Sequence, residues 1–520
     1  MNQPKPLELI SLIEKKSIPK RIRSVLFALL LSSGFCTILL FAAGCMNPSE
    51  PIDPYERFRP AMKQEFSTHL DSLDPLAIYD IDVTLDASGL MTGFAEIVVP
   101  NNSADIWDHL VFRLYPMMKQ YGGFMALQGA SVNGEPTSFV YQPRTDKSAV
   151  RVILPTVLRP SERTKVQLSW TLEVPTWQSY SDAYHLFGTT QEMTSLPLFY
   201  PSLAIYDSED NAGLGGWWLE MGTVRGDAAH NQAALFDVTA TLPSDQVPVT
   251  SGTLITSTLV MSNTMARHQW VTGPSREFLL HSSALFESAV GEAAGTRVTS
   301  YWLPGNEESG RMALQYGVAS LRIFSEKFGP YPYKEMRIAP APLSFRGMEY
   351  PQVNLIGVET YSRFTSSLET LVAHEVAHQW WYQVVHNDPV VFPWLDESIA
   401  EYSIKLYMES IYGDETAREL KAERWQKRVN TLADPTIALD QPVMAYETAG
   451  IYEAIVYSKG ALFYDMLRTE LGPLQFERFL KQYYERYRYQ IVDTDDWRNE
   501  LGLLKNERLL DLYEEWVKDE

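Results

Sequence analysis

The apolar residues of this 520-residue chain change their spacing near residue 300, and that change limits the folds open to it. Before it, apolar and polar residues alternate over 79–85, 166–174 and 236–242, the period of a strand with one buried face. After it, apolar residues recur at helical spacing up to Gly329, and from residue 366 one helical pattern follows another. The pattern predicts a mostly antiparallel β domain over residues 76–300. An α+β domain that ends mostly in helices is expected over 301–520.

The first 44 residues differ from the rest of the chain. A basic stretch at 15–23 precedes an uncharged, apolar or small stretch at 25–43, as in a secretory signal or a membrane anchor. "FAAGC" at 41–45 resembles the end of a bacterial lipoprotein signal, in which Cys45 becomes the lipidated N-terminus. The alternative is an uncleaved N-terminal helix with an incidental cysteine. Both alternatives predict an exported chain held at the cell membrane, with a tether at 45–75.

The formal net charge is -21, and no cluster of Lys or Arg lies in the body of the chain, so nucleic acid is not an expected partner. The two cysteines, Cys36 and Cys45, both lie in the N-terminal segment. We therefore expect the exported body to be stabilised by its core without disulfides.

The stretch "LVAHEVAHQWW" at 371–381 carries the strongest chemical signal. Ser366 and Glu369 fit a capping box, which predicts a helix from 367 to about 385. On that helix His374 and His378 lie on one face, one turn apart, so both imidazoles can reach one ion. Glu375 stands beside the first ligand, as in the H-E-x-x-H arrangement of zinc hydrolases.

A catalytic zinc needs a third protein ligand. Glu397, in "PWLDESIAEY" at 393–402, follows His378 after eighteen residues, enough for a loop and an antiparallel helix. The pattern predicts a zinc site formed by His374, His378 and Glu397. Glu401, one turn further on, either accepts the free N–H of a zinc-bound histidine or is a solvated helix residue.

These motifs resemble the aminopeptidase N family of zinc metallopeptidases, the gluzincins. Three further segments match in the same order: "FGPYPY" at 328–333, "GMEY" at 347–350 and "VYSKGALFYDML" at 456–467. The resemblance covers about residues 76–520 and implies an N-terminal β-saddle domain followed by a thermolysin-like catalytic domain. Tyr350 replaces the family's asparagine. The family's large C-terminal helical domain has no counterpart before Glu520, which leaves substrate length open.

The resemblance also implies roles for single residues. It implies one zinc per chain, Tyr457 as the donor to the oxyanion, and Glu349 as the group that binds the free N-terminus of a peptide. Gly347 and Met348 belong to the same substrate-binding motif, and Glu192 is a second candidate acid. From the mechanism of peptide hydrolysis, Glu375 is the expected general base.

The leading interpretation is an exported zinc aminopeptidase that removes N-terminal residues from peptides. An endopeptidase, or a peptidase for larger substrates, on the same scaffold is an alternative, since no C-terminal domain is expected to narrow the site. A non-catalytic module that binds peptides is a second alternative, from a different class. The oligomeric state and the preferred N-terminal residue stay open.

Overall fold

We analysed a computed structural model of the chain. It describes residues 53–142, 147–177, 186–208, 216–219, 226–227, 229–343 and 346–518. Residues from Arg57 to Glu520 group into one compact unit. The predicted signal or anchor at 1–44, Cys45 and the tether residues 46–52 lie outside the described residues, so these stay predictions. The rest of the expected tether is described, and it forms short helices, η1 (Glu56–Ala61), α2 (Gln64–Ser67) and η2 (Thr68–Ser72), in which Phe58 and Phe66 are buried.

The largest sheet in the described part has eight strands in the order β14-β15-β12-β1-β2-β8-β4-β5. Burial alternates along β1 and β8, as the period of two predicts. Most neighbours pair antiparallel, whereas β1 and β12 pair in parallel. The strands are β1 (Ala77–Leu85), β2 (Leu90–Pro100), β4 (Phe124–Val132), β5 (Glu135–Pro136), β8 (Arg163–Glu173), β12 (Ala234–Pro243), β14 (Thr253–Val260) and β15 (Met265–Val271).

The turn between β1 and β2 shows why these residues form a hairpin. The Asp86 carboxylate accepts hydrogen bonds from the backbone N–H groups of Ser88 and Leu90. Gly89 has φ +84°, a conformation that side chains with a Cβ rarely adopt. The strand predicted from the alternation over 79–85 is therefore confirmed, and the turn pairs it with β2.

Two four-stranded sheets complete the β domain, in the orders β13-β16-β10-β9 and β11-β3-β7-β6. The core between the sheets includes Trp170, Phe199 and Phe236, all nearly inaccessible to solvent. The strands are β3 (Trp107–Arg113), β6 (Phe139–Tyr141), β7 (Ala149–Leu158), β9 (Gly188–Thr189), β10 (Thr194–Pro197), β11 (Ser202–Leu203), β13 (Val247–Thr250) and β16 (Leu279–Ser283).

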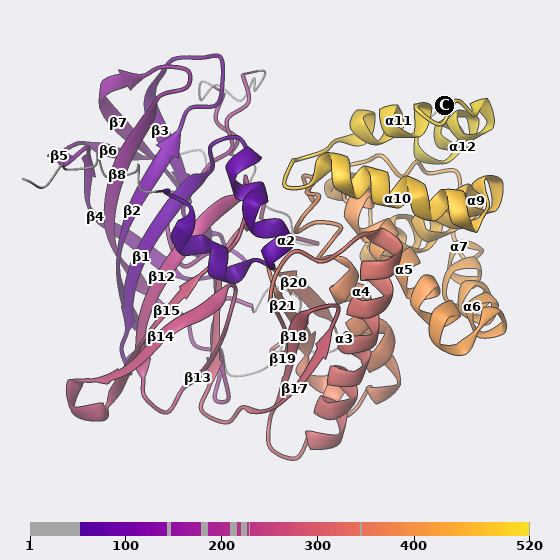
Figure 1. Cartoon of the computed structure of the whole chain (residues 1–520), viewed down its shortest axis with the longest axis horizontal. Helices are drawn as coiled ribbons and strands as arrows, with labels where there is room; N and C mark the ends of the chain where they lie inside the picture. The colour runs from indigo at the N-terminus through magenta and orange to yellow at the C-terminus, as the bar shows by residue number, and fades with distance from the viewer. Residues whose placement is uncertain are drawn as a thin grey trace, which may run out of the picture. The chain divides into compact units, whose positions relative to one another are not determined.

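A five-stranded sheet, β17-β18-β19-β21-β20, lies beside helices α3 and α4 (Figure 1). Its strands are β17 (Glu287–Ala293), β18 (Thr296–Trp302), β19 (Glu335–Ala341), β20 (Gly347–Tyr350) and β21 (Val353–Gly357). The domain boundary expected at 300/301 falls inside β18, which pairs with β19. The sheet therefore takes two strands from the stretch that the sequence pattern assigns to the β domain.

Helices dominate the chain after β21 (Figure 1). The α-helices are α2 (Gln64–Ser67), α3 (Glu307–Phe328), α4 (Leu368–Ala377), α5 (Trp394–Tyr412), α6 (Asp414–Leu420), α7 (Lys427–Val429), α8 (Ala449–Tyr452), α9 (Gly460–Leu471), α10 (Pro473–Tyr487), α11 (Thr494–Gly502) and α12 (Glu507–Val517). Two π-helical segments, η8 (Lys421–Gln426) and η10 (Glu453–Lys459), interrupt the series. The predicted fold class, antiparallel sheets followed by a helical catalytic part, is confirmed.

Within the described residues, we find no helix that combines the length and the apolar character needed to cross a membrane.

Candidate active site

Helix α4 carries the two histidines, but its ends differ from the prediction. It begins at Leu368, and its N-cap Ser367 makes no side-chain cap bond, so the capping box predicted from Ser366 and Glu369 is wrong. The Glu369 carboxylate instead accepts hydrogen bonds from the hydroxyls of Tyr407 at 2.7 Å and Tyr412 at 2.9 Å. Because tyrosines of helix α5 donate to the Glu369 carboxylate, this carboxylate does not cap the start of α4.

The prediction that the zinc helix continues to about residue 385 is also wrong, because α4 ends at Ala377 and His378 is its C-cap. The chain then turns, and the turn places the Trp381 carbonyl 3.0 Å from His378 Nδ1. Trp380 packs against Phe328 and Tyr331 of the "FGPYPY" segment, and its Nε1 donates to the Gly329 carbonyl. The aromatic residues after His378, which the prediction placed in the helix, thus hold the turn against the core.

His374, His378 and Glu397 come together where α4 and α5 pack against each other. His374 Nε2 lies 3.1 Å from Glu397 Oε2 and 3.1 Å from His378 Nε2, and His378 Nε2 lies 3.3 Å from Glu397 Oε2. Ligand atoms around one tetrahedral zinc, each about 2.0–2.2 Å from it, are separated by about 3.3 Å. All three side chains are buried. The spacing of these three ligand atoms therefore fits a single zinc ion. Two histidines and one glutamate are also a known donor set for zinc.

The charges in this site are strongly perturbed. Burial alone raises the pKa of Glu397, but the hydrogen bonds and charges of His374 and His378 outweigh it and hold that pKa far below its usual value. Burial lowers the pKa of His374, which favours the neutral imidazole that binds metal. The site thus provides an ionised carboxylate next to a histidine that is neutral at pH 7.

A second trio, Glu349, His378 and Asp396, also comes within reach of one ion. It uses the same His378 imidazole, whose Nδ1 already faces the Trp381 carbonyl. The Asp396 carboxylate accepts a hydrogen bond from Asn387 at 3.0 Å. These engagements favour His374, His378 and Glu397 as the metal site.

Glu401 is buried, so it is not the solvated helix residue that one alternative described. Its carboxylate accepts hydrogen bonds from Arg424 and from Trp425 Nε1, both carried by η8. Its Oε2 lies 3.7 Å from His374 Nδ1, which is longer than a hydrogen bond. Among the described residues, His374 Nδ1 has no hydrogen-bond partner. Glu401 is the carboxylate placed to receive that N–H after a small movement.

Glu375 points into the cleft, where its Oε2 has no hydrogen-bond partner among the described residues. Burial raises its pKa to about 8. A Cβ added at Gly347 would overlap the Glu375 carboxylate, so the glycine of "GMEY" is required by this close approach. Gly347 therefore makes room for the group with the properties of a general base.

Tyr457 lies on the π-helical segment η10, a type of helix that is frequent at functional sites. Its hydroxyl donates a hydrogen bond to Glu397 Oε1, and its ring stacks on His374 at a centroid distance of 5.8 Å. Gly460 follows η10, and a Cβ there would overlap Ser398 of α5. The glycine allows η10 to approach the zinc-site helix closely enough to bring Tyr457 to the site.

Glu349 lies on β20, the edge strand of the five-stranded sheet, and is 5% exposed. Its Oε1 lies 3.7 Å from His378 Nδ1 and has no hydrogen-bond partner among the described residues. Its carboxyl group shares a hydrogen bond with Asp227, and burial raises its pKa to about 7. A carboxylate beside a metal site, with an oxygen left unbonded, is suited to bind an ammonium group.

The site residues line a cleft of about 540 Å³. Gly347, Met348 and Glu349 form part of its wall, together with the three expected metal ligands, Glu375, Glu401 and Tyr457. Glu192 does not line it, although the resemblance made it a candidate. Asp227, from a loop before β12, lines the cleft instead.

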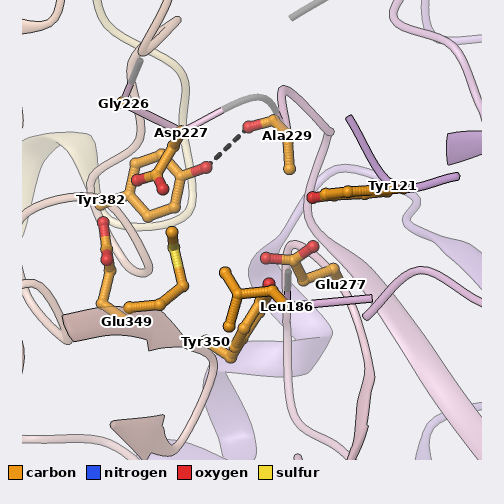
Figure 2. A pocket seen from close by; sticks show the side chains of 10 residues that line it. Tyr121, Leu186, Gly226, Asp227, Ala229, Glu277, Glu349, Tyr350 and Tyr382 are labelled. Carbon is orange, nitrogen blue, oxygen red and sulfur yellow. Dashed lines mark hydrogen bonds between the residues drawn. The ribbon is translucent and has the colours of Figure 1, made fainter. Parts of the chain in front are cut away.

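The sequence analysis missed two carboxyl groups next to Glu349. Asp227 and Glu277 line a small cavity that adjoins the cleft at Asp227 and Glu349 (Figure 2). Neither belongs to a motif, and both lie in loops of the β domain, at least 70 residues before "GMEY" in the sequence. Only an acidic residue in an otherwise apolar stretch, such as Glu277 before "FLL", could have indicated them.

Comparisons with known proteins show to which peptidases the chain is similar. The peptidase family M1 domain matches residues 312–516. Aminopeptidase M1-C of Oryza sativa subsp. japonica is 28% identical over 248 residues, 44% of this chain and 27% of that protein. Aminopeptidase M1-D of the same plant is 25% identical over 301 residues, 55% of this chain and 34% of that protein. The chain spans about a third or less of the length of these relatives.

Solved structures show the same fold. The M1 zinc metallopeptidase from Deinococcus radiodurans superposes with a TM-score of 0.64 at 20% identity, over 85% of this chain and 93% of that one. A mutant of that protein bound to a Tyr-Ser-Ala substrate gives a TM-score of 0.64 at 21% identity, over 85% and 94%. The matched domain thus assigns residues 312–516 to peptidase family M1, and the curated relatives and the shared fold of the M1 zinc metallopeptidases agree with it.

Proposed function

We propose that this protein is a zinc-dependent aminopeptidase that removes N-terminal residues from peptides. The observation that carries the proposal is Glu349, a buried carboxyl group with an unbonded oxygen in the same cleft as the zinc-site residues. Zinc-site residues and a base can cleave any peptide bond presented to them, whereas a group that binds the charged N-terminus restricts cleavage to the first residue.

His374, His378 and Glu397 hold the zinc in this proposal. When bound, zinc is a Lewis acid that makes water a better nucleophile at neutral pH. Glu375 accepts the proton of the attacking water and transfers it to the leaving amine. A cation at the three ligands favours ionised Glu375, so the carboxylate form needed for this step is available at neutral pH.

Tyr457 stabilises the oxyanion of the substrate by donating its phenolic hydrogen. In the structure this hydrogen bond goes to Glu397, so the hydroxyl exchanges partners when the substrate carbonyl arrives. Glu349 binds the α-ammonium group by a charge-assisted hydrogen bond. As an edge strand, β20 leaves backbone groups that can pair with the peptide.

A panel of matched peptides tests the proposal. Peptides with a free N-terminus should lose one residue at a time, and the same peptides should react far more slowly when N-acetylated. A chelator should abolish cleavage and added zinc should restore it. Equal cleavage of free and acetylated peptides would favour an endopeptidase, and no cleavage with zinc bound would favour a module that only binds peptides.

We further propose that the protein is exported and lipidated at Cys45, on the basis of "FAAGC" behind a basic and then apolar segment. The catalytic part would then act on peptides outside the cytoplasm, close to the membrane. Mass spectrometry of membrane-extracted protein should find no peptide from residues 1–44. An intact N-terminal peptide would favour an uncleaved membrane anchor instead.

A further inference from the structure

The small cavity beside Glu349 is lined by aromatic and apolar side chains together with acidic ones. Tyr121, Tyr350, Tyr382 and Leu186 provide buried aromatic and apolar surface. Among the described residues that line it, the charged groups are acidic, Asp227, Glu277 and Glu349, and none is Lys, Arg or His. Buried carboxylates are stabilised by a cationic partner, so a cation that enters this cavity would gain a favourable pairing with these groups.

Glu277 is the innermost of these acids. It is 2% exposed, and its Oε2 has no hydrogen-bond partner among the described residues. Figure 2 shows its carboxyl group directed into the cavity. Burial and the nearby Asp227 raise its pKa to about 8, so these surroundings destabilise the anionic form of the carboxyl group.

The backbone on both sides of Glu277 is held in place. Ser275 pairs with Ala234, the N–H of Phe278 donates to the Tyr200 hydroxyl, and Phe278 is fully buried. The Arg276 guanidinium is occupied with the carbonyls of Gln383, Val384 and Gln490. The backbone that carries Glu277 is therefore held in place, and Nε and Nη2 of the neighbouring Arg276 donate to other groups.

The three carboxyl groups do not converge on one point. Among the described residues, Asp227, Glu277 and Glu349 do not form a set whose oxygens could all reach one metal ion. Asp227 and Glu349 line both the cleft and the cavity, whereas Glu277 lines only the cavity. A ligand that pairs with Glu349 and with Glu277 at the same time must carry two positive groups joined by a chain.

We propose that this cavity receives the side chain of the substrate's first residue and that Glu277 selects lysine or arginine there. The inference rests on the proposed aminopeptidase function, because the α-ammonium group must occupy Glu349 for the side chain to enter beside it. The methylene groups of a basic side chain then pack on the tyrosines, and its terminal cation pairs with Glu277.

The cavity must enlarge substantially to admit such a side chain. The space that remains in it is about 10 Å³, which holds about one water molecule. Met348 lines it and is unbranched, so it can turn aside without disturbing β20. The ion pair that a basic N-terminal residue forms with Glu277 offsets the free-energy cost of this rearrangement. An uncharged chain of the same length gains no such pair, and an acidic residue is repelled.

Two measurements test the proposal. The first compares kcat/KM for lysyl, arginyl, norleucyl and glutamyl amides of one fluorogenic amine. Wild-type protein should prefer lysyl or arginyl over norleucyl by about ten- to a hundredfold, as expected for a charge-assisted hydrogen bond. Glu277→Gln should remove most of that preference and change norleucyl cleavage by less than about threefold. An unchanged preference in Glu277→Gln, or a wild-type preference for norleucyl, would overturn the assignment.

The second measurement does not depend on catalysis. Calorimetry on the zinc-loaded Glu375→Gln variant should show tighter binding of L-lysine than of L-norleucine, and adding Glu277→Gln should remove the difference. Glu292→Gln, an exposed change on β17, is the matched control and should alter neither measurement. If no substrate is cleaved but lysine binding still depends on Glu277, the proposed function fails and the cavity assignment stands. Equal binding of lysine and norleucine would contradict the cavity assignment itself.

Discussion

At the residue scale, Glu375 and Glu397 are two buried carboxylates with different surroundings. Glu397 lies against both histidine Nε2 atoms, whereas Glu375 faces the cleft. We predict that Glu397→Ala loses zinc and activity together, because it removes a ligand. Glu375→Gln should retain zinc and lose activity, because it removes only the base. Metal analysis with activity assays checks both variants, and a fully active Glu375→Gln protein would exclude the proposed mechanism.

The close approach of Gly347 to Glu375 supports a second prediction at this scale. Gly347→Ala should reduce kcat by at least about tenfold with zinc content unchanged, because the new methyl group displaces the base. Gly502→Ala is a matched control, since a Cβ there meets no atom within 4 Å. Wild-type activity in Gly347→Ala would show that Glu375 acts from another position.

At the scale of elements, the two π-helical segments carry none of the expected metal ligands but support the metal site. Segment η10 carries Tyr457, and η8 carries the Arg424 and Trp425 groups that bind Glu401. Glu401 in turn lies beside His374. The geometry of the first histidine therefore depends on a helix with no zinc ligand of its own.

This dependence predicts an effect on metal affinity. Glu401→Ala should weaken zinc binding by about ten- to a hundredfold, the usual cost of losing a group that orients a ligand histidine. Arg424→Ala should have a smaller effect in the same direction. Lys427→Ala, which removes an exposed ion pair with Glu423, is the control. Competition with a chelator of known affinity measures all three, and wild-type affinity in Glu401→Ala would assign Glu401 to packing alone.

The sequence predicted which helices form better than it predicted where they end and which segments they contact. The helical period located α3 and α5, and the H-E-x-x-H spacing located the zinc helix, since both are local patterns. The end of α4 at Ala377 depends on Trp380 packing against "FGPYPY", a contact between distant segments. Tyr457 was found only by resemblance, because nothing in its local sequence separates it from core tyrosines. Asp227 and Glu277 lie in loops, where position is set by tertiary packing alone.

At the scale of the whole molecule, the buried carboxyl groups make stability depend on pH. The folded-state pKa of Glu277 is raised to about 8, so its contribution to stability is fully present below its unfolded-state pKa. That contribution is lost as pH rises through about 8, because ionisation is then coupled to unfolding.

Thermal unfolding of the zinc-loaded protein tests this dependence. Between pH 5 and pH 9, wild type should lose roughly 2–4 kcal/mol more stability than Glu277→Gln, which has no proton to lose at that position. Carboxyl groups that do not interact with Glu277 titrate in both proteins and cancel in the difference. Parallel stability profiles for the two proteins would mean that Glu277 is ionised throughout this range.

The central claim is that Glu349 makes this zinc peptidase an aminopeptidase, and kcat/KM for a free and an N-acetylated form of one peptide tests it most directly. In wild type the free peptide should react much faster than the acetylated one. Glu349→Ala should lower kcat/KM for the free peptide by about ten- to a hundredfold, the worth of a charge-assisted contact, and change the acetylated peptide little. Equal loss on both peptides, or no preference for the free peptide in wild type, would contradict the account.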